Sequence, residues 1–350
     1  MITNKIIRFV FLIVIIMPFA SSCETAEILS DTPTSTQNLN ADHEQKPPTR
    51  VLPSASPDSI VKELSTDTPH PSPTAVSLTR TIKVMTFNIL NGAGVETISA
   101  GDKQWLEEKG YPGNRFDEVI RVVKMVDPDI LGIQEAMGWE LGNPTIAEQF
   151  ATELSMNYVL GLDVHEKSGL HHVGIFTKFE IIDVEDFGAD FSSAAVRATI
   201  QTPDGLKIHV FNAHLMMPLR EQSVVPPEHS DLSALDVNLL EAQSLVSEAQ
   251  KYQNDAVIVL GDMNNYEYGF DILFENKTFG DRPRPASIVE HFRNAGFYSP
   301  RGKDNQVQPV SIDQIWVSPV FNTHFFSIPV PKGIPENVSD HQPVIAEIGY

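Results

Sequence analysis

Polar residues stand directly after short apolar segments at four places in the chain. Short runs that alternate between apolar and polar residues, or that are apolar throughout, predict β-strands. The four segments are 81–87 before Asn88, 129–134 before Glu135, 206–213 before His214 and 256–261 before Asp262. If these strand ends meet at one rim of a sheet core, their side chains converge on a single cleft.

The side-chain types indicate what such a cleft would do. Carboxylate and amide oxygens dominate, and these ligands favour Mg²⁺, Mn²⁺ or Ca²⁺ over zinc. The residues that offer them are Asn88, Glu135, Asp262, Asn264, Asp313 and Asp340. His214 and His341 add imidazoles that exchange protons near neutral pH. Because the sequence contains no G-x-S-x-G elbow, no H-E-x-x-H motif and no P-loop, the pattern favours metal-assisted attack by water on a phosphate ester.

The elements that must position these residues are short strands and amphipathic helices. Apolar residues at helical spacing predict four helices, the last two from weaker patterns: 116–126, 235–252, 145–155 and 286–295. The runs 196–202 and 206–213 flank Pro203-Asp204-Gly205, which predicts a hairpin. Since strands and helices do not alternate strictly, we expect two mainly antiparallel sheets flanked by helices rather than a Rossmann sheet.

Composition excludes several functions. The chain has 25 basic and 46 acidic residues and a net charge of −21, which opposes broad contact with a nucleic-acid backbone. Its single cysteine, Cys23, excludes an internal disulfide framework and a zinc site with several thiolates.

The N-terminus indicates export. Residues 1–8 carry basic side chains and no acid, and the unbroken apolar run 9–20 is too short to span a bilayer as a mature helix. Small residues then lead directly into Cys23, which resembles the lipobox of bacterial lipoproteins. We therefore expect a signal peptide over 1–22 and a lipidated Cys23; an ordinary secretory signal with an incidental cysteine is the alternative.

A long polar segment separates this N-terminus from the rest of the chain. Residues 24–78 are rich in Pro, Ser and Thr and lack aromatic residues and Gly, so they cannot form a core. We expect the lipidated cysteine and a disordered tether over 23–78, followed by one catalytic domain over 79–350.

Seven short motifs in this domain resemble, in order and spacing, those of the endonuclease/exonuclease/phosphatase superfamily. This superfamily includes DNase I-like nucleases, bacterial neutral sphingomyelinases and inositol polyphosphate 5-phosphatases. The motifs are TFNIL (86–90), IQE (133–135), VGIFTK (173–178), NAHL (212–215), GDMN (261–264), SIDQIWVS (311–318) and SDHQPV (339–344). Each alone is weak evidence, because a turn or a helix cap would explain it equally well. The resemblance covers about 81–348 and implies a four-layer α/β/β/α sandwich.

The resemblance also implies roles for the oxygen-bearing residues. Glu135 matches the principal metal ligand of the family, and Asn88 contributes to metal or phosphate binding. Asp340 matches a position that holds a second metal in some members. Asp262 would orient or polarise the attacking water, and Asn264 would hold a phosphate oxygen. The implied cofactor is Mg²⁺, or else Mn²⁺ or Ca²⁺.

Histidines and basic residues complete the implied site. His341 matches a base or transition-state histidine, and Asp313 matches its orienting carboxylate. His214 matches a histidine of the DNase I and sphingomyelinase branches that supports the phosphate or leaving group. Lys178 and Arg197 match positions that are often basic and bind phosphate, although a salt bridge explains each equally well.

These features predict a monomeric phosphodiesterase that is secreted across the cytoplasmic membrane. Its N-terminal lipid would anchor it at the cell surface or envelope. Its substrate would be a phosphate ester in a lipid head group, a nucleotide or a nucleic acid. Two alternatives remain open: a phosphomonoesterase of the same family, and a catalytically silent surface-binding module that keeps the fold.

Overall fold

The computed structural model describes residues 80–162, 172–188, 191, 194–218, 232–265, 288–299, 312–321 and 325–350. All of them lie in one compact unit, Pro71–Tyr350. The predicted signal peptide, Cys23 and tether lie outside the described residues, so those expectations remain predictions. Among the described residues, no helix has the length and apolar character needed to cross a membrane.

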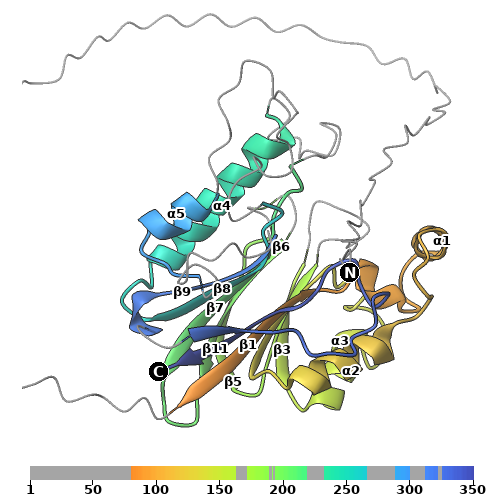
Figure 1. Cartoon of the computed structure of the whole chain (residues 1–350), viewed down its shortest axis with the longest axis horizontal. Helices are drawn as coiled ribbons and strands as arrows, with labels where there is room; N and C mark the ends of the chain where they lie inside the picture. Colours follow the sequence, from red (N-terminus) through yellow and green to blue (C-terminus); the bar gives the residue numbers. More distant parts are fainter. Residues whose placement is uncertain are drawn as a thin grey trace, which may run out of the picture. The chain divides into compact units, whose positions relative to one another are not determined.

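Two sheets form the centre of this unit in the part of the chain that the structure describes (Figure 1). The first has the strand order β10-β11-β1-β2-β4-β3, which are Phe325–Ile328, Val344–Gly349, Thr81–Asn88, Ile130–Gln134, Val173–Thr177 and Asn157–Gly161. The second has the order β5-β6-β7-β8-β9, which are Glu180–Asp186, Ala194–Gln201, Lys207–His214, Ala256–Asp262 and Asp313–Val317. Each sheet therefore brings together strands from distant parts of the sequence.

Strand directions agree with the prediction of mainly antiparallel sheets. One pair in each sheet is parallel, β1 with β2 and β7 with β8, and the other pairs are antiparallel. The predicted hairpin is β6–β7, where Gln201 pairs with Lys207 across the turn. Gly205 lies in this turn at φ +91°, a conformation that glycine adopts readily.

The helices cover the outer faces of the two sheets (Figure 1). They are α1 (Ala100–Glu108), α2 (Phe116–Val126), α3 (Ile146–Leu154), α4 (Ala234–Gln250) and α5 (Ile288–Asn294), with short 3₁₀ segments η1 (Asn91–Gly94) and η6 (Pro319–Phe321). One apolar cluster joins α2 and α3 to the first sheet, another joins α4 and α5 to the second, and a third fills the space between the sheets. The predicted α/β/β/α sandwich is confirmed.

Helix ends follow local sequence signals. The capping boxes Thr145/Glu148 and Ser233/Asp236 begin α3 and α4, and α2 ends at Asp127 in the left-handed conformation. The sequence pattern did not predict α1, because only Leu106 in it is buried. With one buried side chain, α1 shows almost no apolar periodicity.

Candidate active site

Strand register brings the predicted site residues to one end of both sheets. In the first sheet, Asn88 pairs with Gln134, and Glu135 follows directly. In the second sheet, Asp262 pairs with both His214 and Asp313. Because β1/β2 and β7/β8 are parallel pairs, their carboxyl ends lie at the same edge, and a rigid scaffold holds the polar side chains there.

Asn88 joins the two sheets at this edge. Its fully buried amide donates through Nδ2 to Glu135 Oε1 and to Asp262 Oδ2, each at 3.0 Å. Its Oδ1 accepts from the Leu90 N–H at 3.0 Å. The amide therefore spaces two carboxylates and turns its oxygen toward the backbone. This geometry differs from the expectation that Asn88 offers an oxygen to a metal.

A left-handed turn holds Glu135. Residues Leu90 to Gly94 all have positive φ, between 46° and 68°, which is costly for residues other than glycine. Within this turn the Asn91 N–H donates to Glu135 Oε2 at 2.8 Å and the Gly92 N–H donates to the Glu135 carbonyl at 2.7 Å. Glu135 itself has φ +57°. Strain of this kind persists only where the surroundings hold it. Here the turn fixes Oε2 of Glu135, and the Asn88 amide fixes Oε1.

Asp262 occupies the centre of the second sheet's edge and is 1% exposed. Its Oδ1 accepts from the Asn264 N–H at 2.9 Å, while its Oδ2 lies 3.6 Å from His214 Nε2 and 3.9 Å from His341 Nε2. The Asn264 side chain donates to the Leu215 carbonyl at 2.9 Å. Asp262 thus has one oxygen fixed by the backbone and one that faces two imidazoles.

His341 forms a buried ion pair with Asp313. The two side chains meet through Nδ1 and Oδ2 at 2.8 Å. Burial lowers the pKa of His341, but the Asp313 carboxylate, with Asp262 and Asp340, outweighs burial and raises that pKa to about 11. Burial also raises the pKa of Asp313 to about 6, against the opposing effect of His341. At neutral pH His341 is therefore a cation and Asp313 an anion.

Ser339 fixes the segment that carries His341. It is 7% exposed, its hydroxyl donates to the Asn88 carbonyl at 2.7 Å, and the His341 N–H donates to the hydroxyl at 3.1 Å. Asp340, between them, has an exposed side chain whose Oδ1 lies 3.9 Å from His341 Nε2. The His341 loop and the end of β1 are thus one hydrogen-bonded unit.

The donor set at this edge suits a hard divalent cation. Ligand atoms of Asp262, Asp313 and His341 lie within 4.8 Å of one another. Since Nδ1 of His341 and Oδ2 of Asp313 pair with each other, the carboxylates that remain to face a cation are those of Asp262, Glu135 and Asp340. These oxygens fit Mg²⁺, Mn²⁺ or Ca²⁺ better than zinc.

Two predicted phosphate-binding residues lie elsewhere. Lys178 follows β4 at the opposite end of the first sheet, where Thr177 pairs with Ile130, and it forms ion pairs with Asp127 at 2.8 Å and Asp129 at 3.1 Å. The structure therefore supports the salt-bridge interpretation for Lys178.

Arg197 is on the outer face of β6. It pairs with Asp183 at 2.8 Å and Glu185 at 3.1 Å, and its guanidinium lies 5.1 Å from the centre of the Tyr252 ring. The structure does not bring Arg197 to the cluster around Asp262, since its neighbours in β6, such as Val196, face the space between the sheets and Arg197 faces the other way.

The burial of Arg115 was not predicted. From the sequence, Arg115 opens a helix and its side chain was expected to be solvated, yet it is 1% exposed. Its guanidinium donates to the Leu90 carbonyl at 2.6 Å and its backbone N–H donates to the Ala93 carbonyl at 2.7 Å. Arg115 thus stabilises the left-handed turn. Its contact with Leu90 joins residues 25 positions apart, and no local sequence pattern indicates it.

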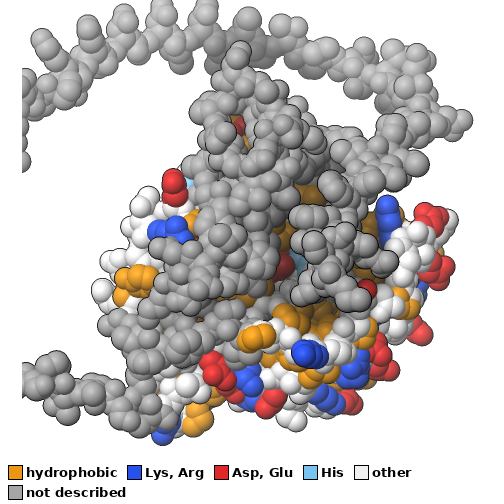
Figure 2. Space-filling view, in the orientation of Figure 1, with side chains coloured by type: hydrophobic (Ala, Val, Ile, Leu, Met, Phe, Trp, Pro, Cys, Tyr) orange, Lys and Arg blue, Asp and Glu red, His pale blue; other side chains and the backbone are white. Residues whose placement is uncertain are grey.

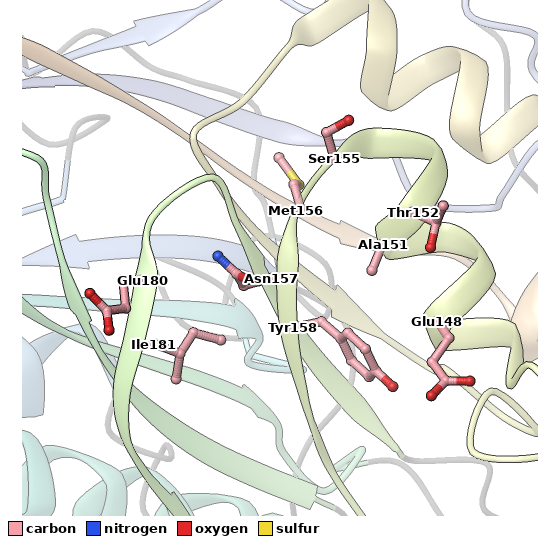
Figure 3. Close-up of a pocket in the computed structure, with 9 residues that line it drawn as sticks. All are labelled: Glu148, Ala151, Thr152, Ser155, Met156, Asn157, Tyr158, Glu180 and Ile181. Carbon is pink, nitrogen blue, oxygen red and sulfur yellow. The ribbon is translucent and has the colours of Figure 1, made fainter.

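A concavity of the described surface lies away from these residues. It measures about 520 Å³ and is lined by α3 and by the beginnings of β3 and β5, among them Tyr158 and Glu180 (Figure 3). Asn157, in its wall, pairs with Thr177 at the end of the first sheet opposite Glu135. This pocket is therefore separate from the candidate active site.

Comparison with known proteins agrees with this geometry. The model of the "Endonuclease/Exonuclease/phosphatase family" matches residues 85–341, which is more than half of the chain. The chain belongs to this family. It is accordingly a phosphoester hydrolase by family, a group that contains nucleases and phosphatases. No curated protein matches the chain significantly.

Solved structures of the endonuclease/exonuclease/phosphatase family share the fold. A family protein from Bacteroides thetaiotaomicron is 18% identical with a TM-score of 0.53, and 77% of this chain covers 98% of that one. The mannosyl-6-phosphatase Bt3783 from Bacteroides thetaiotaomicron VPI-5482 is 19% identical with a TM-score of 0.50, over 77% and 100% of the two chains. An AP endonuclease from Archaeoglobus fulgidus is 18% identical with a TM-score of 0.50, over 76% and 98%. At such identities the likeness establishes the fold.

Proposed function

We propose that this domain is a divalent-metal-dependent phosphodiesterase that hydrolyses its substrate by direct attack of water. One observation carries the proposal: the His341–Asp313 ion pair faces Asp262, which Asn88 links to Glu135 on the other sheet. A hydrogen-bond donor, His341, thus meets two carboxylates, those of Asp262 and Glu135, at one edge of the sheets. This combination suits phosphoryl transfer, where catalysis consists mainly of positioning and electrostatic stabilisation.

In the proposed reaction Glu135 and Asp340 would hold the cation. A bound divalent cation supplies positive charge for the non-bridging phosphate oxygens. The N–H groups of Asn88 and Asn91 that donate to Glu135 orient its carboxylate as a ligand. The turn is then a support for the metal ligand, which explains why its strain is retained.

The proton chemistry falls to His341, in the loop before β11, and to residues at the edge of the second sheet. Because its pKa is raised to about 11, His341 is a cation at neutral pH and acts as a hydrogen-bond donor to the phosphate rather than as a base. Asp262 would orient the attacking water through Oδ2, the oxygen that accepts from Asn88 and faces the imidazoles, and would accept the proton that the water loses, while a proton from His341 passes to the leaving oxygen as its bond to phosphorus breaks. His214 and Asn264 donate to the phosphate or the leaving group. Both imidazoles lie within 4 Å of Asp262 Oδ2, and the resemblance of His214 to a histidine of the DNase I and sphingomyelinase branches favours a phosphodiesterase.

The substrate class follows from charge and location. On the face shown in Figure 2, basic side chains of described residues alternate with acidic ones and do not gather into a patch. Together with the net charge of −21, this disfavours binding along a nucleic-acid duplex. We propose a small phosphodiester, such as a lipid head group or a nucleotide, reached by a monomeric enzyme that is exported and anchored to the membrane through Cys23.

Hydrolysis of bis-p-nitrophenyl phosphate with Mg²⁺ or Mn²⁺ tests the proposal, with p-nitrophenyl phosphate as the monoester. We expect diester turnover that EDTA abolishes and Mn²⁺ restores. Glu135→Ala and His341→Ala should each lower kcat by about 10²- to 10⁴-fold without unfolding the domain, as circular dichroism would show. Asp129→Asn, at the far end of the sheet, is the matched control and should remain active.

The other outcomes of this assay identify the alternatives. A preference for the monoester would indicate a phosphomonoesterase. No turnover of any ester in a panel of sphingomyelin, inositol phosphates, nucleotides and DNA would indicate a silent surface-binding module. Turnover that is insensitive to EDTA would contradict metal-dependent catalysis.

A further inference from the structure

The loops that follow β7 and β8 leave the sheet side by side. The last ladder hydrogen bond between them runs from the Leu215 N–H to the Asp262 carbonyl at 3.0 Å. Beyond it, Met216 and Met263 are 2% and 0% exposed. Backbone carbonyls buried in this way need hydrogen-bond donors, and past the end of a ladder a neighbouring strand no longer supplies them.

A single side chain from α4 supplies them. Asn238 is fully buried, and its Nδ2 donates to the Met216 carbonyl at 2.8 Å and to the Met263 carbonyl at 3.0 Å. Its Oδ1 accepts from Asn265 Nδ2 at 2.9 Å. One amide group thus binds the loop that follows His214 and, twice, the loop that follows Asp262.

Neighbouring contacts reinforce this arrangement. Glu241, one helical turn further along α4, accepts the Met216 N–H at 2.6 Å. Gln314 Nε2 donates to the Asn265 carbonyl at 2.8 Å, which extends the same network to β9, the strand that begins with Asp313. Asn238 is therefore the point where α4 is bonded to the ends of both parallel strands.

We propose that Asn238 is a positioning residue that holds together the loops that follow His214 and Asp262, and with them the placement of these two side chains around the attacking water. The inference rests on the proposed function. Strands in a sheet are twisted relative to one another and diverge beyond their last hydrogen bond. The two N–H donors of the Asn238 amide bridge the Met216 and Met263 carbonyls. An aspartate at this position would have no such donors, and a glutamine side chain would be one methylene longer. A displacement of about 1 Å between catalytic groups can cost about 100-fold in rate.

The test compares Asn238→Leu, which keeps the size of the side chain and removes its hydrogen bonds, with Ser318→Ala. Ser318 is 1% exposed and bridges the Asp255 carbonyl and the Val257 N–H at the opposite end of β8. Both variants lose buried hydrogen bonds, but only Asn238→Leu loses them at the catalytic edge. Ser318→Ala therefore controls for a general loss of stability.

With bis-p-nitrophenyl phosphate and Mn²⁺, we expect Asn238→Leu to lower kcat by about 10- to 100-fold while KM and the half-saturating Mn²⁺ concentration change less than about twofold. Ser318→Ala should keep the wild-type kcat per folded molecule. A kcat of Asn238→Leu within about twofold of wild type would overturn the proposal. If Asn238→Leu does not fold, we expect the same fall in kcat at unchanged KM in Asn238→Gln. A wild-type kcat in Asn238→Gln would then refute the positioning role of Asn238.

Hydrogen exchange without substrate separates this inference from the proposed function. Peptides that cover 213–217 and 260–265 should exchange about tenfold faster or more in Asn238→Leu than in wild type, and at the wild-type rate in Ser318→Ala. If the wild-type protein hydrolyses no ester, the proposed function fails while exchange still decides whether Asn238 joins the loops. Equal exchange rates of these peptides in the two variants would refute the inference that Asn238 joins the two loops.

Discussion

The charge state of His341 can be tested by removing its partner with Asp313→Asn. In the wild type the pKa of His341 is raised to about 11, so the imidazolium that we assign as donor is fully populated at pH 8. Asparagine keeps a hydrogen-bond acceptor at the position but removes the negative charge closest to the ring, 2.8 Å away. Asp262 and Asp340 still raise the pKa and burial still lowers it, so we expect it to return to near its ordinary value of about 6.5.

The size of the effect follows from this shift. A group with a pKa of about 6.5 is protonated in about 3% of molecules at pH 8 and in about three quarters at pH 6. Asp313→Asn should therefore lose about 30-fold in kcat at pH 8 relative to wild type from this cause alone, and less than about twofold at pH 6. The sign is set by the proposed role: a cationic donor is lost as pH rises through its pKa.

The assay is the pH profile of kcat from pH 5.5 to 9 at saturating Mn²⁺ with bis-p-nitrophenyl phosphate. Asp129→Asn, which breaks an ion pair with Lys178 at the far end of the sheet, is the control and should keep the wild-type profile. An Asp313→Asn profile that falls uniformly, with the same shape as that of the wild type, would refute the reasoning, because the carboxylate would then not control the protonation of His341.

Three further predictions concern the support of the site and the stability of the fold. Arg115→Met removes the guanidinium that donates to the buried Leu90 carbonyl, which then keeps the Ala93 N–H as a donor, and should lower the free energy of unfolding by about 1–3 kcal/mol, measured by urea denaturation. Gly92→Ala would place a Cβ 2.2 Å from the Met137 carbonyl oxygen at φ +61°; we expect a loss of at least about 1 kcal/mol and weaker Mn²⁺ binding by calorimetry, and unchanged binding would contradict the role of the turn. Burial, and then a nearby arginine, lowers the pKa of His209, so its contribution to stability is present above about pH 6.5 and lost as pH falls; urea midpoints at pH 5 and 7.5 should differ less in His209→Gln than in wild type.

The secondary structure was largely predictable because local signals agree with tertiary packing. The helix α2 was predicted with its observed bounds, since its apolar spacing ends at Asp127-Pro128, where the chain turns left-handed. The helix α4 was predicted over 235–252 from apolar residues at helical spacing, of which Ala242, Val246 and Ala249 are buried and Leu235 and Leu239 only partly so. Asn238 and Glu241 also lie on its buried face. These two polar residues on the buried face of the helix were not part of the apolar pattern from which it was predicted.

The residue types of the site could be inferred, but their partners could not. Strand ends predict that Glu135 and Asp262 lie at an edge. Only the pairing of two sheets shows that Asn88 donates to both carboxylates. Lys178 and Arg197 illustrate the limit: each occupies a position that is often basic in the family, and each neutralises acidic neighbours away from the edge.

The sequence by itself determined the element types, the sheet class, the ordered motifs and hence the family, because strand alternation, helix caps and turn residues act over a few neighbouring positions. Only the tertiary structure decided that the amide nitrogen of Asn88 faces two carboxylates, which histidine is held as a cation and which helix residue joins the loops that follow His214 and Asp262. Those properties depend on burial and on charges that lie within about 4 Å in space. Residues as far apart in the chain as Asn88 and Ser339 meet there, and no local pattern records their distance.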